Sequence, residues 1–283
     1  MKTAIKINDL TKKYKDVTAV DRLNLEIYEG ELFSLLGVNG AGKTTCLSAI
    51  LSTIHHEGKI YLFNKEKENL TFEERQDIGV VFDENSYSDL LTIKDIEMIS
   101  KALYKKWDHD YFMDLCRQHH LSMNKKIKEF SKGMKMKLNI FTALAHHPKL
   151  LILDEATSGL DPVARDELLD VFYDFVSDGK HSILMSSHIL SDIEKIADMI
   201  TFISGGHVLL SESKDDLLAK YVLVRCSEDE AKNFNSNDIL GVRKHAYGVE
   251  VCVAKSAALN MNSDPVTLDD VMVFAARSRK EKR

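Results

Sequence analysis

The residues from Gly37 to Thr45, GVNGAGKTT, are of the types that hold a phosphate chain. They fit the pattern G-x-x-x-x-G-K-[ST], in which glycines let backbone N–H groups turn inward and cradle anionic oxygens. Lys43 brings a positive charge to the β- and γ-phosphates, and the hydroxyl of Thr44 is suited to Mg²⁺. The loop therefore predicts a site for a nucleoside triphosphate and its magnesium ion. Its candidate nucleotide ligands are Gly37, Asn39, Gly40, Ala41, Gly42, Lys43, Thr44 and Thr45.

Two carboxylates follow an apolar segment later in the chain. The segment Leu150–Asp154, LLILD, reads as a buried strand that delivers Asp154 at its carboxyl end, and Glu155 comes next. Open α/β sheets bind their ligands at that end of the strands. We expect Asp154 to hold the water shell of the metal, and Glu155 to act as the general base or the water-orienting group for attack on the γ-phosphate. The alternative for Glu155 is a capping or ion-pairing carboxylate.

The elements that must position these residues alternate between strands and helices, which indicates an α/β fold with a mostly parallel sheet. A strand at Glu31–Leu36 leads into the loop, and a helix at Lys43–Ser52 turns its N-terminal dipole toward the phosphates. The other predicted strands are the antiparallel pair Ala4–Leu10 and Val17–Leu25, then Lys59–Phe63, Ile78–Phe82, Ser182–Ser186, Met199–Ile203 and His207–Ser211. The other predicted helices are Ile93–Tyr104, Tyr111–His119, Pro162–Val176, Ile189–Ala197 and Asp215–Tyr221.

The character of the chain changes after Gly205-Gly206. Two further strands, Val222–Cys226 and Val249–Val253, flank a polar stretch, and Thr267–Arg277 reads as an amphipathic helix. We therefore expect a main domain over residues 1–221 and a small C-terminal extension over residues 222–283.

Composition limits the classes of partner. The 283 residues are 44% hydrophobic and carry a net charge of −6, whereas a protein that coats nucleic acid usually presents a strongly basic face. We expect no nucleic-acid partner. The chain has no apolar run of about 18 residues, which a spanning helix needs, and no apolar signal core at its start. We therefore expect a cytoplasmic protein that does not cross a membrane by itself.

Tyr14 lies in the polar turn KKYKD between the first two predicted strands. An aromatic side chain at that place is either a packing residue at the tip of a hairpin or a flat platform for a purine base. Sequence position alone leaves both interpretations open.

Taken together, these residues resemble the ATP-binding subunits of ABC transporters over about residues 1–220. Gly37–Thr45 is similar to the Walker A motif of that family, with Val38 where proline is usual, and Leu150–Glu155 is similar to Walker B. Residues 158–162, SGLDP, resemble the D-loop, and residues 130–134, FSKGM, fall at the signature motif. His188 takes the place of the switch histidine. All of these motifs occur in the family order.

The resemblance implies a P-loop ABC ATPase fold with a mixed core sheet, an N-terminal antiparallel β-subdomain, a small helical subdomain at about residues 85–147 and a short α+β C-terminal extension. It implies that Tyr14 stacks on adenine and that Glu155, His188 and Lys43 are catalytic. It further implies that Ser131, Gly133 and Asp161 contact ATP across a dimer. The implied magnesium ligands are Thr44 and Asp154, with Asp83 as a further candidate.

Two departures from the family pattern bear on the mechanism. In the signature motif Lys132 replaces the first glycine and Met134 the glutamine, while Ser131 and Gly133 remain. After the Ile78–Phe82 strand the family has a glutamine that meets Mg²⁺ and links the site to the membrane subunit. Asp83 stands there instead; it can bind a hard cation, but it donates no hydrogen bond when ionised.

The implied function is ATP binding and hydrolysis, with ATP and Mg²⁺ bound, in a subunit that powers a membrane ABC transporter. The variant motifs resemble the ABC-2-type bacterial exporters of peptide, drug or lipid-like cargo. The implied partners are a separate transmembrane permease and a second ATPase chain, in a homodimer or a paralogous heterodimer, so that the protein lies on the inner face of the membrane. The alternative is a soluble ABC-type ATPase with a non-transport role. A P-loop kinase leaves the Ser131 and Asp161 motifs unexplained.

Overall fold

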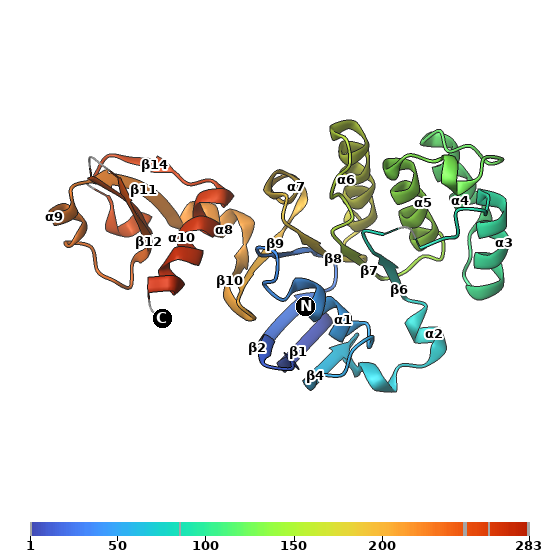
Figure 1. The fold of residues 1–283 in the computed structure, drawn as a ribbon, viewed down its shortest axis with the longest axis horizontal. Helices are drawn as coiled ribbons and strands as arrows, with labels where there is room; N and C mark the ends of the chain where they lie inside the picture. The colour runs from blue at the N-terminus through green and yellow to red at the C-terminus, as the bar shows by residue number, and fades with distance from the viewer. Residues whose placement is uncertain (1, 85, 246–247, 260, 282–283) are drawn as a thin grey trace.

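The computed structural model describes residues 2–84, 86–245, 248–259 and 261–281. The described chain forms three sheets (Figure 1), and β3 (Leu32–Leu36) of the central sheet comes before β4 (Glu57–Leu62) and β5 (Lys65–Glu66) of the N-terminal sheet in the sequence. A four-stranded sheet is N-terminal, a six-stranded sheet forms the centre, and a second four-stranded sheet lies at the C-terminal end of the molecule. The predicted α/β class with a mixed core sheet is confirmed.

The central sheet has the strand order β10-β9-β3-β8-β7-β6, parallel throughout except that β10 pairs antiparallel with β9. Every residue of β3, β7 and β8 is buried, as expected for parallel strands covered on both faces. The six strands are β3 (Leu32–Leu36), β6 (Ile78–Val81), β7 (Leu150–Asp154), β8 (Ser182–Ser187), β9 (Met199–Ser204) and β10 (His207–Ser213).

The N-terminal sheet is antiparallel and covers one face of the central sheet. Its strands are β1 (Thr3–Tyr14), β2 (Val17–Tyr28), β4 (Glu57–Leu62) and β5 (Lys65–Glu66). Apolar side chains of β1 and β2 share one buried cluster with α1 (Lys43–Ile50) and with β3. This packing holds α1, the helix that follows the phosphate loop, between the two sheets.

A helical region stands beside the central sheet, on the right of Figure 1. It holds α3 (Ile93–Leu103), α4 (His109–Gln118) and α5 (Lys132–Leu144), preceded by the short α2 (Phe72–Arg75). The fully buried rings of Phe112 and Phe141 lie in its core. Asn85, where the predicted helical region begins, lies outside the described residues.

Three more helices follow the later strands of the central sheet: α6 (Pro162–Val176), α7 (Leu190–Ile196) and α8 (Lys214–Lys220). Asp161 caps α6, and Pro162 occupies its first turn, where the missing N–H costs no helical hydrogen bond. In α7 the buried side chains of Ile193 and Ile196 join the main apolar cluster, which holds this helix against the sheet.

The C-terminal sheet has the order β12-β13-β11-β14. Its strands are β11 (Tyr221–Cys226), β12 (Ile239–His245), β13 (Gly248–Ala254) and β14 (Ser263–Pro265), and its helices are α9 (Glu228–Ala231) and α10 (Leu268–Glu281). The sequence pattern predicts β11, β13 and α10 but not β12 or β14. Both are edge strands with few buried residues, so they lack the apolar pattern that marks a central strand.

Helix α10 joins this sheet to the rest of the molecule. Phe274 of α10 is fully buried, and Gly241 of β12 approaches it so closely that an added Cβ would lie 2.5 Å from the Phe274 carbonyl oxygen. At the start of α10 the Leu268 N–H donates to Glu194 Oε1 of α7 at 3.2 Å.

The proposed boundary at residue 222 stays a prediction. Among the described helices, none is both long and apolar enough to cross a bilayer.

Replacing Phe274 by alanine is expected to lower the free energy of unfolding by about 3–5 kcal/mol, because it leaves a cavity under the C-terminal sheet. Chemical denaturation of the full chain measures this. Leu259→Ala is the control, since Leu259 is 78% exposed. Equal losses for the two variants would contradict the packing role of Phe274.

Candidate functional site

The phosphate loop runs from the end of β3 to the start of α1. Gly42 precedes the helix with a φ of 111°, a backbone conformation that side chains disfavour. A Cβ at Gly42 would lie 2.6 Å from the Ala19 carbonyl oxygen, and one at Gly37 would lie 2.5 Å from that of Ile203. Glycine is therefore required at both ends of the loop by close approach of the backbone of β2 and β9.

The middle of the loop faces outward. Asn39 and Gly40 are exposed, and Ala41 is held by hydrogen bonds of its backbone to Val38 and Gly206, each 3.0 Å long. Thr44 is exposed and Thr45 half-buried, at the first turn of α1. The loop is thus anchored at its ends and presents its centre to a ligand.

Lys43 is buried, with a side chain only 6% exposed. Its Nζ donates to the Gly37 carbonyl oxygen at 2.7 Å and lies 3.4 Å from Glu155 Oε1. The ammonium group therefore bridges the phosphate loop and the carboxylate that follows β7.

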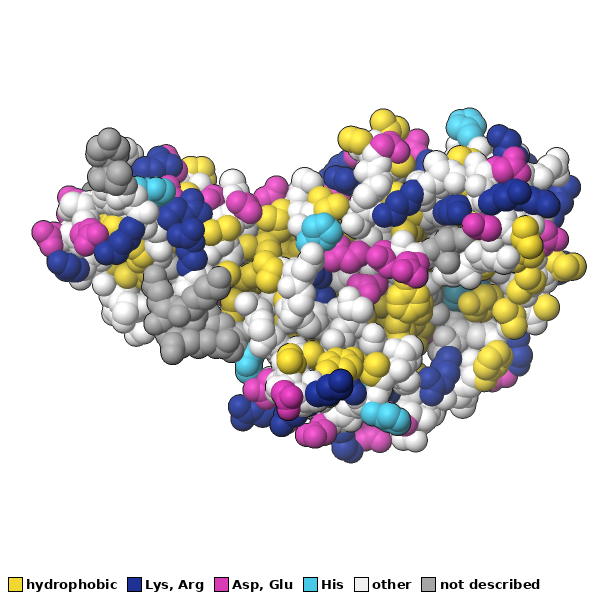
Figure 2. All heavy atoms as spheres, viewed as in Figure 1, with side chains coloured by type: hydrophobic (Ala, Val, Ile, Leu, Met, Phe, Trp, Pro, Cys, Tyr) yellow, Lys and Arg dark blue, Asp and Glu magenta, His cyan; other side chains and the backbone are white. Residues whose placement is uncertain are grey.

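Three neighbouring parallel strands bring the predicted catalytic residues together. β8 lies between β3 and β7, with Leu36 in register with Ser187 and Asp154 in register with Ser186. Because parallel strands end at the same edge of a sheet, the phosphate loop, Glu155 and His188 meet there. Figure 2 shows acidic side chains beside a histidine at the centre of the molecule, where these strands lie in Figure 1.

Glu155 is held from both sides. Its Oε2 pairs with His188 Nδ1 at 2.6 Å, and its Oε1 faces Lys43. Its backbone has a φ of 52°, in the left-handed region that is strained for a residue with a side chain. Strain of this kind persists only where the surroundings impose it, and it is common at functional sites.

Ser186 is a site residue that the sequence analysis missed. Its hydroxyl is fully buried; it donates to Asp154 Oδ1 at 2.5 Å and accepts from the Glu155 N–H at 3.1 Å. One side chain thus orients both carboxylate residues. The one signal in the sequence is that polar residues, Ser186 and Ser187, end a strand whose middle, Ile183–Met185, is apolar.

Tyr14 ends β1 and is 46% exposed. Lys12 Nζ lies 4.8 Å from the centroid of its ring, in a cation–π contact. The partner strand β2 begins at Val17 and, two residues on, places the Ala19 carbonyl against Gly42. Tyr14 therefore stands on the same hairpin that lines the phosphate loop.

Ser131, Gly133 and Asp161 form a second group at the starts of α5 and α6. A Cβ on Gly133 would lie 3.2 Å from Ala164 Cβ and 3.9 Å from Asp161 Oδ2. The Ser131 hydroxyl caps α5. Asp161 accepts two backbone N–H groups of α6, from Ala164 and then Val163, and these bonds lower the pKa of its carboxyl group.

The two departures from the family pattern lie at different places. Lys132 extends along the loop before α6, where its Nζ would be 2.7 Å from a Cβ on Gly159. Asp83 is exposed just after β6, which neighbours β7 in the sheet. Asn139 of α5 donates to the Glu84 carbonyl oxygen at 3.3 Å, so this turn is linked to the helical region.

The oxygen donors near the loop suit a metal that is shared with a phosphate. Thr44 offers a hydroxyl and Asp154 a carboxylate, both hard ligands of the kind Mg²⁺ binds. Within the described part of the chain, no group of three or more His, Cys, Asp or Glu residues is arranged to hold a metal ion. Mg²⁺ itself takes few protein ligands and completes its shell with phosphate oxygens and water.

Comparison with known sequences finds relatives over most of the chain. Residues 20–158 match the model of the ABC transporter family. The bacitracin transport ATP-binding protein of Bacillus licheniformis is 36% identical over 224 residues, which cover 78% of this chain and 72% of that protein. The lantibiotic transport ATP-binding protein of Streptococcus pyogenes is 33% identical over 75% of this chain and 91% of its own length.

Comparison with solved structures gives the same kind of match. An ATP-binding subunit of an ABC transporter superposes with a TM-score of 0.69 at 26% identity, over 76% of this chain and 92% of that one. A dimeric ATP-binding cassette bound to ADP and phosphate superposes with a TM-score of 0.66 at 25% identity, over 74% of this chain and 98% of that one.

Replacing Ser186 by alanine is expected to lower kcat for ATP hydrolysis by about 10- to 100-fold, because it removes both the charge-assisted hydrogen bond to the Asp154 carboxylate and the bond that holds the Glu155 N–H. The KM for ATP should change little, since the phosphate loop is untouched. Steady-state kinetics measure both constants.

Ser182→Ala is the matched control for this variant. Ser182 is equally buried, at the other end of β8, and accepts from the Gly30 N–H at 3.0 Å. The Ser182→Ala variant should lose some thermal stability but keep the kcat of the parent chain. An unchanged kcat in Ser186→Ala would remove the orienting role of that hydroxyl.

Proposed function

This chain belongs to the ABC transporter family of ATP-binding proteins, and from that premise we propose how its residues bind ATP, hydrolyse it and pass the work to a membrane subunit. The observation that carries the proposal is the contact of Lys43 and His188 with opposite oxygens of Glu155, at the ends of three neighbouring strands. The Lys43 ammonium that would bind phosphate, the Glu155 carboxylate and the His188 imidazole are thereby within reach of one reacting group.

In the proposed binding mode, the N–H groups of residues 37–45 and the Lys43 ammonium hold the phosphates, and Tyr14 stacks on adenine. Thr44 and Asp154 bind Mg²⁺, with Asp83 as a further candidate. When bound, Mg²⁺ neutralises the charge that develops on the phosphate oxygens. The exposed ring of Tyr14, on the hairpin that backs Gly42, supports its part in this mode.

Hydrolysis is proposed to depend on a competition for Lys43. Phosphate oxygens that draw the ammonium group away from Glu155 Oε1 leave that oxygen free to accept a proton from water. His188 would keep the other oxygen of Glu155 in place and contact the γ-phosphate. The left-handed backbone of Glu155, fixed through Ser186, supports a carboxylate that is positioned before ATP arrives.

We propose that two such chains close head to tail around ATP. Ser131 and Gly133 of one chain, with Asp161 beside them, would cover the triphosphate on the loop of the other. Their position together at the starts of two helices supports this, and so does the dimer of the similar cassette with ADP and phosphate. Hydrolysis would remove contacts that bridge the chains and so reopen the pair.

The membrane partner is proposed to bind near Asp83–Leu91 and the adjacent α3. Large apolar side chains are exposed there, and Figure 2 shows such side chains gathered over α3 and near α2, on the right. They are Phe72, Phe82, Leu90, Met98, Ile99 and Leu103. Exposed apolar patches of this kind mark sites of protein association.

We propose a peptide-like export cargo, because the similar proteins are named for transport of bacitracin and lantibiotics. Those names also favour transport over a soluble, non-transport role. The protein would then lie on the cytoplasmic face of the membrane, bound through a separate permease.

Glu155→Gln is expected to abolish most ATP turnover, by about 100-fold or more, since an amide accepts no proton from water at neutral pH. ATP-dependent dimers should accumulate, because closure would no longer be followed by hydrolysis. Phosphate release and light scattering measure the two effects. The control is Glu68→Gln, whose side chain is 63% exposed. Turnover that survives in Glu155→Gln would exclude Glu155 as the base.

Leu90→Asp tests the membrane contact. Leu90 is 68% exposed, so the variant should keep the ATPase activity of the isolated chain but lose association with its permease. Co-purification from detergent extracts measures that association. Leu259→Asp, at a 78% exposed site of the C-terminal extension, should still co-purify. Equal recovery of both variants would place the permease elsewhere.

A further inference from the structure

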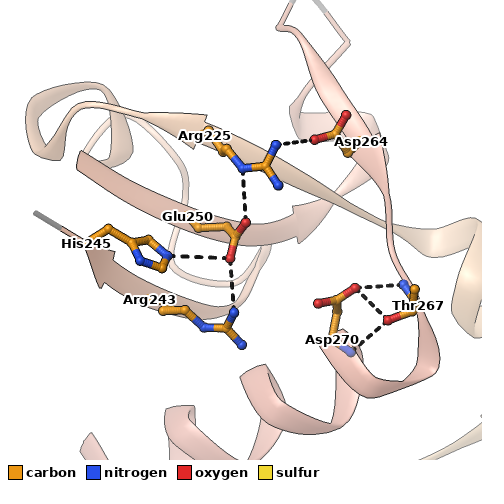
Figure 3. Close-up of polar contacts among 7 residues, drawn as sticks. All are labelled: Arg225, Arg243, His245, Glu250, Asp264, Thr267 and Asp270. Carbon is orange, nitrogen blue, oxygen red and sulfur yellow. Dashed lines mark hydrogen bonds and ion pairs between the residues drawn. The ribbon is translucent and has the colours of Figure 1, made fainter. Parts of the chain in front are cut away.

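A pocket of about 560 Å³ opens on the C-terminal sheet, far along the molecule from the phosphate loop. Side chains of three strands line it: Arg225 of β11, Arg243 and His245 of β12, and Glu250 of β13. Figure 3 shows the two guanidinium groups and the imidazole turned toward the one carboxylate. Its volume lies within the range of sites for small organic ligands.

The register of the strands builds this cluster. Glu250 is directly opposite Arg225 on one side and opposite Arg243 on the other. Arg225 Nε donates to Glu250 Oε1 at 3.2 Å, Arg243 Nη1 donates to Oε2 at 3.4 Å, and His245 Nε2 lies 3.7 Å from the same Oε2. The carboxylate side chain is only 9% exposed, so it is the floor of the pocket.

The charge of the pocket lining is unequal. Two guanidinium groups face one buried carboxylate, which leaves one positive charge before His245 is counted. Asp264, outside the lining, pairs with Nη1 of Arg225 at 2.7 Å and offsets that charge, so the lining offers a ligand N–H donors without a partner rather than a net charge. No hydrogen bond to a described residue uses Nη2 of Arg225 or of Arg243, and the buried Nε of Arg243 has no partner in the described structure.

The cationic groups are also held in place. The guanidinium of Arg243 lies on the Phe274 ring of α10, 5.0 Å from its centroid, which restricts it to one plane. Gly248, with a φ of 144°, lets β13 approach β11, where a Cβ would lie 2.7 Å from the Cys226 carbonyl oxygen. Donors that are fixed before binding lose little entropy when a ligand arrives.

We propose that this pocket binds the oxyanion group of a small organic molecule, a phosphate or a carboxylate. Guanidinium groups offer paired N–H donors that match either oxyanion in a bidentate arrangement. Glu250 orients the two arginines from below, and their unused Nη2–H groups donate hydrogen bonds to the ligand. The alternative is a cross-strand row of ion pairs that only stabilises the sheet.

The test is a titration of the full chain, saturated with Mg²⁺ and ADP so that the phosphate loop is filled. The probes are phenyl phosphate and benzoate, which separate the two oxyanion classes. The readout is NMR of the arginine Nε–Hε resonances, with those of Arg225 and Arg243 assigned from their lysine variants. At least one probe should shift both resonances along a saturable curve.

Variants then separate a binding site from a structural ion row. Arg243→Lys, followed through the Arg225 resonance, should weaken binding about tenfold, because lysine keeps the charge but loses the paired donors. Arg225→Lys, at a 68% exposed side chain, should do the same if Arg243→Lys fails to fold. Arg117→Lys, at a 69% exposed side chain on α4, is the matched control. Shifts that stay linear with both probes, or lysine variants that bind as the parent does, would overturn the proposal.

Discussion

The arrangement of the site depends on one constraint of parallel sheets, namely that neighbouring strands all end at the same edge. β8 lies between β3 and β7, so the residues that follow these three strands lie side by side at that edge. The contacts of Glu155 with Lys43 and His188 are the direct result. A one-residue change of register in β8 would turn Ser186 to the other face and release both Asp154 and Glu155.

Much of this arrangement could be predicted from sequence because the loop and the strand LLILD carry local signals. Gly42 has a backbone conformation that favours glycine, and Asp154 follows the four buried residues Leu150–Leu153. Ser186 could not be predicted, because its role arises from a strand pairing between residues far apart in the chain. Strand β12 was missed for a related reason: it lies at the edge of its sheet, and its pattern becomes clear only beside β13 and α10.

The C-terminal extension is physically continuous with the ATPase core. Leu268 and Val271 of α10 belong to the same apolar cluster as Ile193 of α7, the helix that follows His188. The hydrogen bond from Leu268 to Glu194 crosses the same contact. Arg243, which lies on Phe274 of α10, and His188, which precedes α7, are therefore linked through one packed pair of helices.

The central position of β3 also has a consequence for how the molecule is made. Both of its neighbours, β8 and β9, lie more than half the chain away, beyond the residues 37–181 that separate them from β3. A ribosome adds roughly 5–20 residues per second, so the newly synthesised strand LFSLL waits on the order of ten seconds for any partner. During that interval an apolar strand can leave the exit tunnel with both edges unpaired. Unpaired edges are open to association with neighbouring chains on the same polysome until β8 and β9 have emerged.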